Sequence, residues 1–267
     1  MSVDIQWTLA ADPGGQPTRE FRIVREGKRD ITGALWLVKE ELPIEGLPNN
    51  AQAASTLMCF GHGASGDRYQ APICGLAKRF TQEAKLPVLS LDGPVHGLRQ
   101  IGDGARGAFF PEFQRSDSLK DMVDDWTCAI EEMQSLPEIG IGKLAYFGLS
   151  MGSIFGIPLL ASRKDVTVAT LGLFGVQSSF PHEEEFIAAA QKITCPLLFL
   201  MQLEDELFER EGYLKIFDLF ASIDKRLHAN PGLHPEITGE EIDFAFDFLN
   251  SHINDTSKQR VVNPFAE

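Results

Sequence analysis

From residue 56 onward, short apolar runs alternate with segments long enough to form helices. The runs occupy residues 56–60, 87–91, 143–147, 166–174 and 196–201, and residues 225–229 continue the series as a final strand. Continuous apolar runs of this length are typical of parallel strands that are buried on both faces. The intervening segments predict helices over 68–84, 116–136, 183–192, 208–222 and 240–253, and one more directly after 147. This alternation predicts an α/β fold, in which crossover helices cover both faces of a mostly parallel sheet.

The first part of the chain has a different pattern. Residues 18–25 and 31–38 each read as extended, and the polar residues EGKR between them form a turn, which together predict an antiparallel hairpin. Residues 44–54 predict a loop. Because we find neither an internal repeat nor an inter-domain linker, we expect residues 1–267 to form a single domain, with the polar stretch 255–267 loosely held.

Composition narrows the class of protein. The chain carries 24 Lys and Arg against 38 Asp and Glu, a net charge of −14, and 43% of its 267 residues are apolar. These values are those of a globular protein, and the acidity argues against nucleic acid and anionic membranes as partners. No apolar run reaches the ~20 residues that cross a bilayer, and the N-terminus lacks a secretory signal pattern. The four cysteines have no metal-binding spacing. We therefore expect a soluble cytoplasmic protein with free thiols, no metal and no cofactor.

One pentapeptide carries the signature of a nucleophile. Residues Gly148 to Gly152 match G-x-S-x-G, which is a weak signal alone, but the apolar run 143–147 leads into it and a helix pattern follows without a gap. A strand that turns sharply into a helix places the central serine at the top of the sheet, beside the free N–H groups of the helix N-terminus. The pattern predicts that Ser150 is a catalytic nucleophile.

A serine nucleophile needs a base, and the base needs an acid that orients it. In a parallel sheet both come from loops at the carboxyl ends of later strands. The run 196–201 is followed by QLEDELF, from which we select Asp205 as the acid and keep Glu204 in reserve. Among the six histidines, His234 follows the turn NPGL and precedes the last helix, so we select it as the base. The chain order Ser150, Asp205, His234 is that of α/β-hydrolases.

The oxyanion of an acyl-transfer intermediate needs two preorganised N–H donors. The backbone of Met151, at the start of the helix after the nucleophile, supplies one of them. The Gly-rich turn GHGASG follows the run 56–60, and the N–H of Ala64 in this turn is the candidate for the second. We interpret His62 as a residue at the substrate pocket whose ring braces this turn by hydrogen bonding, and not as the base.

Taken together, these segments resemble an α/β-hydrolase of the esterase and dienelactone-hydrolase-like group. The matching motifs are GHGASGD, LDGPVHGLR, FGLSMG, LEDELF and NPGLHPE, and they occur along the chain in the same order as in that family. The resemblance implies an eight-stranded, mostly parallel sheet with helices on both faces, an N-terminal antiparallel hairpin and no large cap. It also implies hydrolysis of a small-molecule ester or thioester through an acyl-enzyme. Dienelactone hydrolases carry cysteine where this chain has Ser150, and prolyl-oligopeptidase relatives carry a propeller that about 50 N-terminal residues cannot supply.

Other functions stay open on the sequence. A C–C bond hydrolase or a lactone hydrolase can use the same three residues, because a fold does not determine its substrate. A catalytically silent α/β-hydrolase scaffold that binds a ligand or partner is the alternative from a different class. The oligomeric state is not determined by the sequence.

A Gly-rich loop over residues 92–115 is the longest connection at the predicted active edge. We interpret Asp92 and His96 in its first part as structural residues. Phe109, Phe110 and Phe113 follow close together, either as an apolar wall for the acyl or alcohol group or as a hydrophobic cluster or dimer contact. The segment 175–195 is long enough for one crossover helix and too short for a cap domain.

Overall fold

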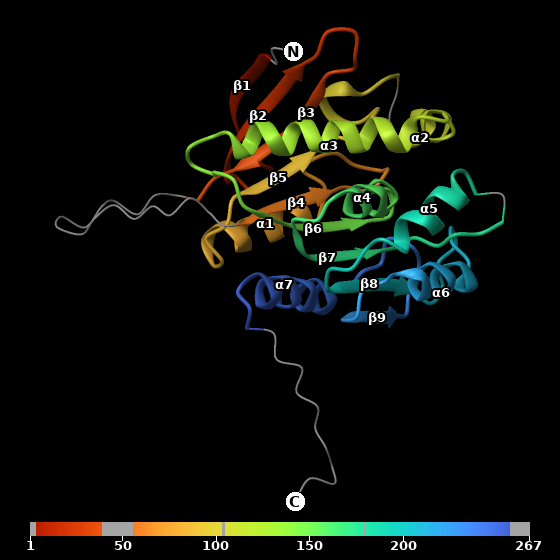
Figure 1. Cartoon of the computed structure of the whole chain (residues 1–267). Coiled ribbons are helices and arrows are strands. Elements are labelled where there is room, and N and C mark those ends of the chain that lie inside the picture. The colour runs from red at the N-terminus through yellow and green to blue at the C-terminus, as the bar shows by residue number, and fades with distance from the viewer. Residues whose placement is uncertain (1–3, 39–55, 103–104, 179, 257–267) are drawn as a thin grey trace, which may run out of the picture.

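A nine-stranded sheet forms the centre of the molecule (Figure 1). The computed structural model describes residues 4–38, 56–102, 105–178 and 180–256. The strands are β1 (Asp4–Ala11), β2 (Pro17–Val24), β3 (Ile31–Trp36), β4 (Thr56–Gly61), β5 (Val88–Leu91), β6 (Lys143–Leu149), β7 (Val166–Gly172), β8 (Leu197–Gln202) and β9 (Lys225–Asn230). Their spatial order is β1-β2-β3-β5-β4-β6-β7-β8-β9. The strands β4 to β9 pair in parallel, whereas β1, β2 and β3 pair antiparallel.

Helices cover both faces of the sheet, as the alternating pattern predicts. They are α1 (Ile73–Gln82), α2 (Ala105–Phe113), α3 (Ser118–Gln134), α4 (Met151–Ser162), α5 (Glu183–Ala190), α6 (Arg210–Leu219) and α7 (Gly239–Ile253). Helices α2 to α6 contribute to the core on one face, and α1 and α7 to the core on the other. Alternate positions of a strand point to opposite faces, so in β8 Leu197 and Phe199 join the first core while Leu198 and Leu200 join the second.

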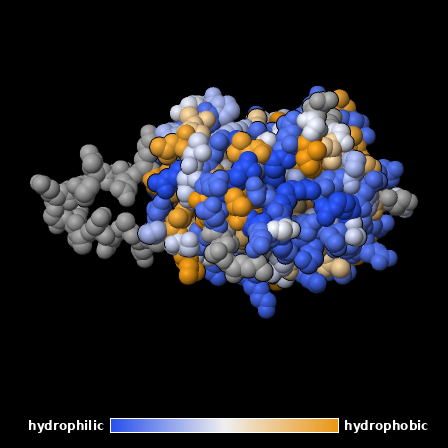
Figure 2. All heavy atoms as spheres, turned by 90° about the horizontal axis from the view of Figure 1, so that it is seen from above, coloured by the Kyte–Doolittle hydropathy of each residue, from blue (hydrophilic) through white to orange (hydrophobic). Residues whose placement is uncertain are grey.

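The predicted hairpin is present, but it belongs to a larger antiparallel unit. Strands β2 and β3 pair with Ile23 opposite Ile31, and β1 adds a further strand at the outer edge. The sheet therefore has one strand more than the eight implied by the resemblance. Most residues of β1 are exposed on both faces, so this strand lacks the alternating pattern that would reveal it. Figure 2 shows the molecule from above, the side on which β1 and β2 lie in Figure 1. This face is mainly hydrophilic, and its hydrophobic side chains form small separate groups.

Two predicted elements differ in extent. The loop predicted over 92–115 contains a short 3₁₀ helix, Gly97–Arg99, and the helix α2. The helix predicted over 68–84 begins only at Ile73. The preceding segment is instead held by Arg68, whose buried guanidinium donates to Asp92. The predicted loop 44–54 and the tail beyond residue 256 lie outside the described residues.

The parallel strands bring the ends of distant segments to one edge of the sheet. The arrowheads of these strands point toward the same side in Figure 1. The loops that follow β4, β5, β6, β8 and β9 therefore meet there, and these loops carry the residues that the sequence singles out. In the described part of the chain, no helix is both long and apolar enough to cross a membrane.

Candidate active site

Ser150 lies in a strained turn between β6 and α4. Its backbone has φ 56° and ψ −118°, a conformation that residues with a Cβ seldom adopt. The Ser150 N–H donates to the carbonyl of Gly172 at 2.9 Å, which fixes the turn to the end of β7. The side chain is half-buried. The strand–turn–helix context predicted for the G-x-S-x-G segment is therefore present.

The glycines on either side of Ser150 are required by close backbone contacts. A Cβ on Gly152 would lie 2.3 Å from the carbonyl oxygen of Gly61, and a Cβ on Gly148 would lie 2.7 Å from the carbonyl oxygen of Gly152. Neither distance is possible for real atoms, so only glycine allows α4 to start this close to the end of β4. The contact brings the turn after β4 next to the nucleophile turn.

A chain of hydrogen bonds joins Ser150, His234 and Asp205. The Nε2 atom of His234 lies 2.9 Å from Ser150 Oγ, and its Nδ1 atom lies 2.7 Å from Asp205 Oδ2. The side chains of His234 and Asp205 are only 6% and 1% exposed. An ionised carboxylate can only accept, so Nδ1 carries the proton and Nε2 is free to accept from the serine hydroxyl. The structure thus brings together the three residues predicted from three separate loops.

The Asp205 carboxylate receives four hydrogen bonds. Its Oδ1 accepts from the backbone N–H groups of Leu207 at 2.7 Å and Phe208 at 3.1 Å. Its Oδ2 accepts from His234 and from the hydroxyl of Tyr213. Burial alone raises the pKa of a carboxyl group, but here the bonds from His234, Tyr213 and the backbone hold the pKa of Asp205 below its usual value. Asp205 therefore stays ionised at neutral pH.

The reserve candidate Glu204 has a different place. Its Oε2 accepts from the N–H of Gly232 at 2.5 Å, in the turn that precedes the histidine. Glu206 accepts from the backbone N–H of His234 at 2.8 Å. These two exposed carboxylates hold the loop that carries His234, while Asp205 between them reaches the ring itself. The geometry favours Asp205 over Glu204 as the partner of His234.

The turn after β4 is held in one orientation by side chains. The Nδ1–H of His62 donates to the carbonyl of Gly63 at 2.8 Å, while its Nε2 accepts from the N–H of Gly93 at 2.8 Å. The Gly63 carbonyl and the Ala64 N–H belong to one trans peptide and point in opposite directions. His62 therefore fixes the direction of the predicted Ala64 donor. Met151 is the first residue of α4, where backbone N–H groups have no partner within the helix.

The loop after β5 rests on buried polar groups, as predicted for Asp92 and His96. Asp92 is fully buried and accepts from Thr32 Oγ1 at 2.6 Å and from Arg68 Nη1 at 3.1 Å. His96 is buried as well, and its Nε2–H donates to the carbonyl of Ala64 at 3.2 Å. Burial lowers the pKa of His62, and it lowers the pKa of His96 to about 4. Both rings are neutral at pH 7 and act as braces of the turn after β4.

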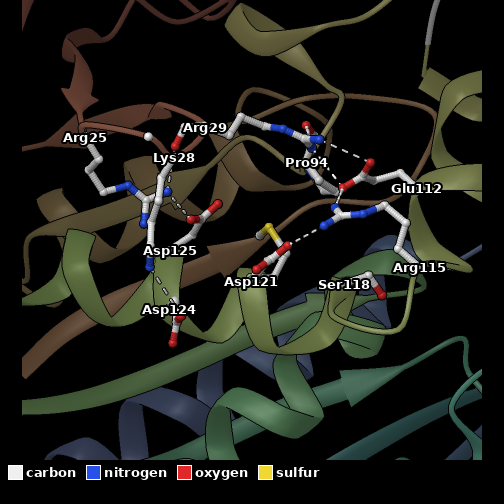
Figure 3. Close-up of a pocket in the computed structure, with 12 residues that line it drawn as sticks. Arg25, Lys28, Arg29, Pro94, Glu112, Arg115, Ser118, Asp121, Asp124 and Asp125 are labelled. Atoms are coloured by element: carbon white, nitrogen blue, oxygen red, sulfur yellow. Dashed lines mark hydrogen bonds and ion pairs between the residues drawn. The ribbon is translucent and has the colours of Figure 1, made fainter.

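The outer side of the loop after β5 borders a cavity of about 300 Å³ (Figure 3). Ser150, His234 and Asp205 are not among the residues that line it. Its charged side chains pair with one another across the gap between the β2–β3 turn and the helices α2 and α3. Arg29 bonds to Glu112 at 3.0 Å and to the carbonyl of Pro94 at 2.7 Å, while Arg25 bonds to Asp125. Asp125 also binds the buried Arg99 at 2.7 Å. We interpret this network as the support of the loop after β5.

The three phenylalanines predicted near the site do not form one surface. Phe113 is 1% exposed and Phe109 is 8% exposed, and both pack in the core, whereas Phe110 is 51% exposed. Phe109 alone reaches toward the braces, with its ring 5.9 Å from that of His96. Of the two interpretations left open by the sequence, the burial of Phe109 and Phe113 favours a hydrophobic cluster over a common wall, because α2 turns consecutive residues to different sides.

One other aromatic residue lies beside the hydrogen-bonded chain, and a second packs against it. The ring of Phe208 lies 5.8 Å from that of His234 and 5.7 Å from that of Phe180. Phe208 ends the LEDELF segment, which is the one signal in the sequence that pointed to it. No sequence signal pointed to Phe180, because it lies in an irregular segment between β7 and α5. Phe208 therefore packs beside the predicted base, and Phe180 packs against both Phe208 and the buried Phe113.

Comparisons with known proteins agree with this architecture. No family model and no curated protein matches the chain. Solved structures do match. A zinc-bound cold-adapted esterase from an Arctic intertidal metagenomic library has 25% sequence identity and a TM-score of 0.73, with 93% of this chain and 99% of that chain covered.

Two acetyl xylan esterases are similar in fold at lower identity. That of Paenibacillus sp. R4 has 16% identity and a TM-score of 0.70, with 94% of this chain and 90% of that chain covered. That of Thermoanaerobacterium sp. JW/SL YS485 has 14% identity and a TM-score of 0.67, with 94% and 88% covered. Together with the sheet order, these matches show that the chain has the α/β-hydrolase fold. The predicted fold class and the resemblance to α/β-hydrolase esterases are confirmed.

Proposed function

We propose that the protein is a serine hydrolase that cleaves a carboxylic ester or thioester of a small molecule through an acyl-enzyme on Ser150. The observation that carries the proposal is the bond chain from Ser150 Oγ through His234 to Asp205, with distances of 2.9 and 2.7 Å. A catalytically silent scaffold would bind its ligand or partner without this arrangement of a strained serine, an oriented histidine and a buried carboxylate, so the arrangement favours an enzyme. The esterases among the similar structures support an ester as the scissile group.

Each residue then has a defined role in the reaction. The Nε2 atom of His234 takes the hydroxyl proton as Ser150 Oγ attacks the acyl carbon, and the imidazolium gives that proton to the leaving alcohol or thiol. Asp205 keeps the imidazole in the Nδ1–H tautomer and stabilises its charged form. The N–H groups of Ala64 and Met151 receive the oxyanion of each tetrahedral intermediate. Water attacks the acyl-enzyme in the second half-reaction, again with His234 as base.

A covalent probe tests this proposal directly. We expect a fluorophosphonate to label the folded protein once, at Ser150, and labelling to vanish in Ser150→Ala. Turnover of a panel of esters, thioesters, lactones and C–C bond substrates then identifies the scissile bond. Folded protein that neither reacts with the probe nor hydrolyses any ester would overturn the proposal and support the scaffold. Turnover of lactones or C–C substrates alone would move the function to that class.

The pH dependence of kcat/KM is set by the ionisable groups whose protonation state the reaction requires. We expect kcat/KM to fall about tenfold per pH unit on the acid side of neutrality, because one histidine must be neutral to accept the serine proton. Hydrogen bonds hold the pKa of Asp205 below its usual value, and burial lowers the pKa values of His62 and His96, so the ionised carboxylate and the two neutral rings are favoured at neutral pH. Initial rates from pH 4.5 to 9 measure the slope. A slope of two, or an acid limb below pH 4, would contradict a single histidine base.

The size of the acyl group is limited by the surroundings of Ser150. Between β7 and β8 the only helix in the described residues is α5, with 8 residues, which is too small for a cap domain. Each buried CH₂ contributes about 0.8 kcal/mol only while there is apolar surface to cover it. With p-nitrophenyl esters we expect kcat/KM to peak at short chains, up to ~6 carbons, with no rise in rate above the solubility limit. A preference for C12 or longer acyl chains, or interfacial activation, would contradict this prediction.

A further inference from the structure

Tyr213 extends the hydrogen-bonded chain beyond Asp205. It lies on α6, it is fully buried, and its hydroxyl donates to Oδ2 of Asp205. This is the same oxygen that accepts from Nδ1 of His234. The other carboxylate oxygen accepts only from the backbone N–H groups of Leu207 and Phe208. Tyr213 is therefore the one side chain besides His234 that bonds to this carboxylate in the described part of the chain.

The position of Tyr213 is fixed by its surroundings. Its ring packs against Phe199 and Phe208, with centroid distances of 6.1 and 6.3 Å. The preceding residue, Gly212, lies so close to the segment after β7 that a Cβ there would be 2.8 Å from the carbonyl of Val176. The N–H of Val176 in turn donates to the Gly212 carbonyl at 3.2 Å. The start of α6 is therefore tied to the segment after β7, and this contact keeps the Tyr213 hydroxyl directed at Asp205.

The hydroxyl remains a donor at any pH at which the enzyme works. Burial, followed by the bond to Asp205, raises the pKa of Tyr213 well above its usual value. Two donors thus share one oxygen, and the negative charge that Asp205 offers to His234 is reduced by the share that the phenol takes. The same bond restricts rotation of the carboxylate and so the orientation of the imidazole ring.

We propose that Tyr213 is a positioning residue that acts through Asp205, setting both the orientation of His234 and the pH at which this base becomes active. The inference rests on the proposed function, since it assigns a role within the same reaction. The role needs the hydroxyl group alone, because the ring packs in the core whether or not it carries an oxygen.

The substitution Tyr213→Phe isolates the hydroxyl. Without it, the full charge of Oδ2 faces His234, which favours the imidazolium, so the acid limb of the kcat/KM profile moves to higher pH by about 0.5 unit. The carboxylate also loses one of its restraints, so we expect kcat to fall about tenfold with KM changed less than about threefold. Rates are measured with p-nitrophenyl acetate from pH 4.5 to 9 and divided by the concentration of active sites, titrated with a fluorophosphonate.

Tyr69→Phe is the matched control. This tyrosine also bonds through its hydroxyl to a carboxylate, Glu20, at 3.1 Å, but that carboxylate is bound to Arg68 and not to a histidine. We expect Tyr69→Phe to leave the acid limb where it lies in the unmodified protein. A second test combines Tyr213→Phe with Asp205→Asn, and because Tyr213 acts through Asp205, the two losses in kcat should combine to much less than their product.

The outcomes separate this inference from the proposed function. A shifted limb in Tyr213→Phe only, with non-multiplicative losses in the double variant, supports the positioning role. An unshifted limb, with activity lost only in proportion to folded protein, overturns it, since a purely structural hydroxyl would change stability and not the titration. The pH at which the acid limb falls does not depend on the fraction of active protein, so partial misfolding does not produce a shift of this limb. If Ser150→Ala retains full activity, the proposed function itself fails, whatever Tyr213→Phe does.

Discussion

Ser150→Ala and His234→Ala should each lower kcat by on the order of 10⁴ or more, and the double variant should be little worse than either. In the proposed mechanism the three hydrogen-bonded residues act as one unit, because the hydroxyl is not a nucleophile without its base and the base has no proton to accept without the hydroxyl. In all three variants we expect the remaining rate enhancement to come from substrate binding and from the proposed N–H donors of Ala64 and Met151. Steady-state rates with a short-chain ester measure the effect.

Matched variants control for the loss of a polar side chain. Ser162→Ala removes a hydroxyl from the same helix, where it bonds only to the carbonyl of Leu159, and His228→Ala removes an imidazole paired with Glu241. We expect both to retain most of the activity. If Ser150→Ala keeps turnover comparable to that of Ser162→Ala, or if the double variant loses the product of the single losses, the three residues do not form a catalytic unit.

The sequence was sufficient where a local pattern has one structural solution. The apolar runs predict buried parallel strands because each run is too short for a typical helix and helix-length segments separate the runs. The G-x-S-x-G segment places Ser150 for a similar reason, since the contacts of Gly148 and Gly152 leave no room for a Cβ. The strand and helix on either side then determine which edge of the sheet the serine faces.

The remaining features depend on contacts that no local pattern encodes. Strand β1 is exposed on both faces, so its pairing with β2 leaves no hydrophobic alternation. The sequence interval that contains Phe109, Phe110 and Phe113 favours a loop because of its glycines, but tertiary packing against α3 and the core makes part of it helical. Tyr213 lies in an ordinary amphipathic helix pattern, and only the fold reveals that its hydroxyl reaches a carboxylate on another loop.

The choice between Asp205 and its acidic neighbours shows the same limit at the site. Three carboxylates stand together after β8, and on the sequence each is a solvated acidic residue as readily as a catalytic one. In the structure the three carboxylates accept hydrogen bonds from different donors. Glu204 and Glu206 accept from backbone N–H groups of the loop that carries His234, whereas Asp205 accepts from the His234 imidazole. The paths of the two loops decide this, and the pairing of β8 with β9 continues into them through the backbone bonds from Leu203 to Asn230 and from Glu204 to Gly232.

Asp205→Asn should therefore lower kcat by about 10³- to 10⁴-fold, while Glu204→Gln should cost no more than about tenfold. Each oxygen of Asp205 accepts from two donors, and an amide has only one oxygen. In Asp205→Asn an N–H₂ group must face either the loop N–H groups or the pair of Tyr213 and His234. The second arrangement drives the imidazole to the tautomer with its proton on Nε2, which cannot accept from Ser150. Glu204→Gln keeps a carbonyl oxygen for the N–H of Gly232, so the histidine loop stays in place. Rates on one short-chain ester, normalised to folded protein, measure both variants, and a larger loss in Glu204→Gln than in Asp205→Asn would move the acid to Glu204.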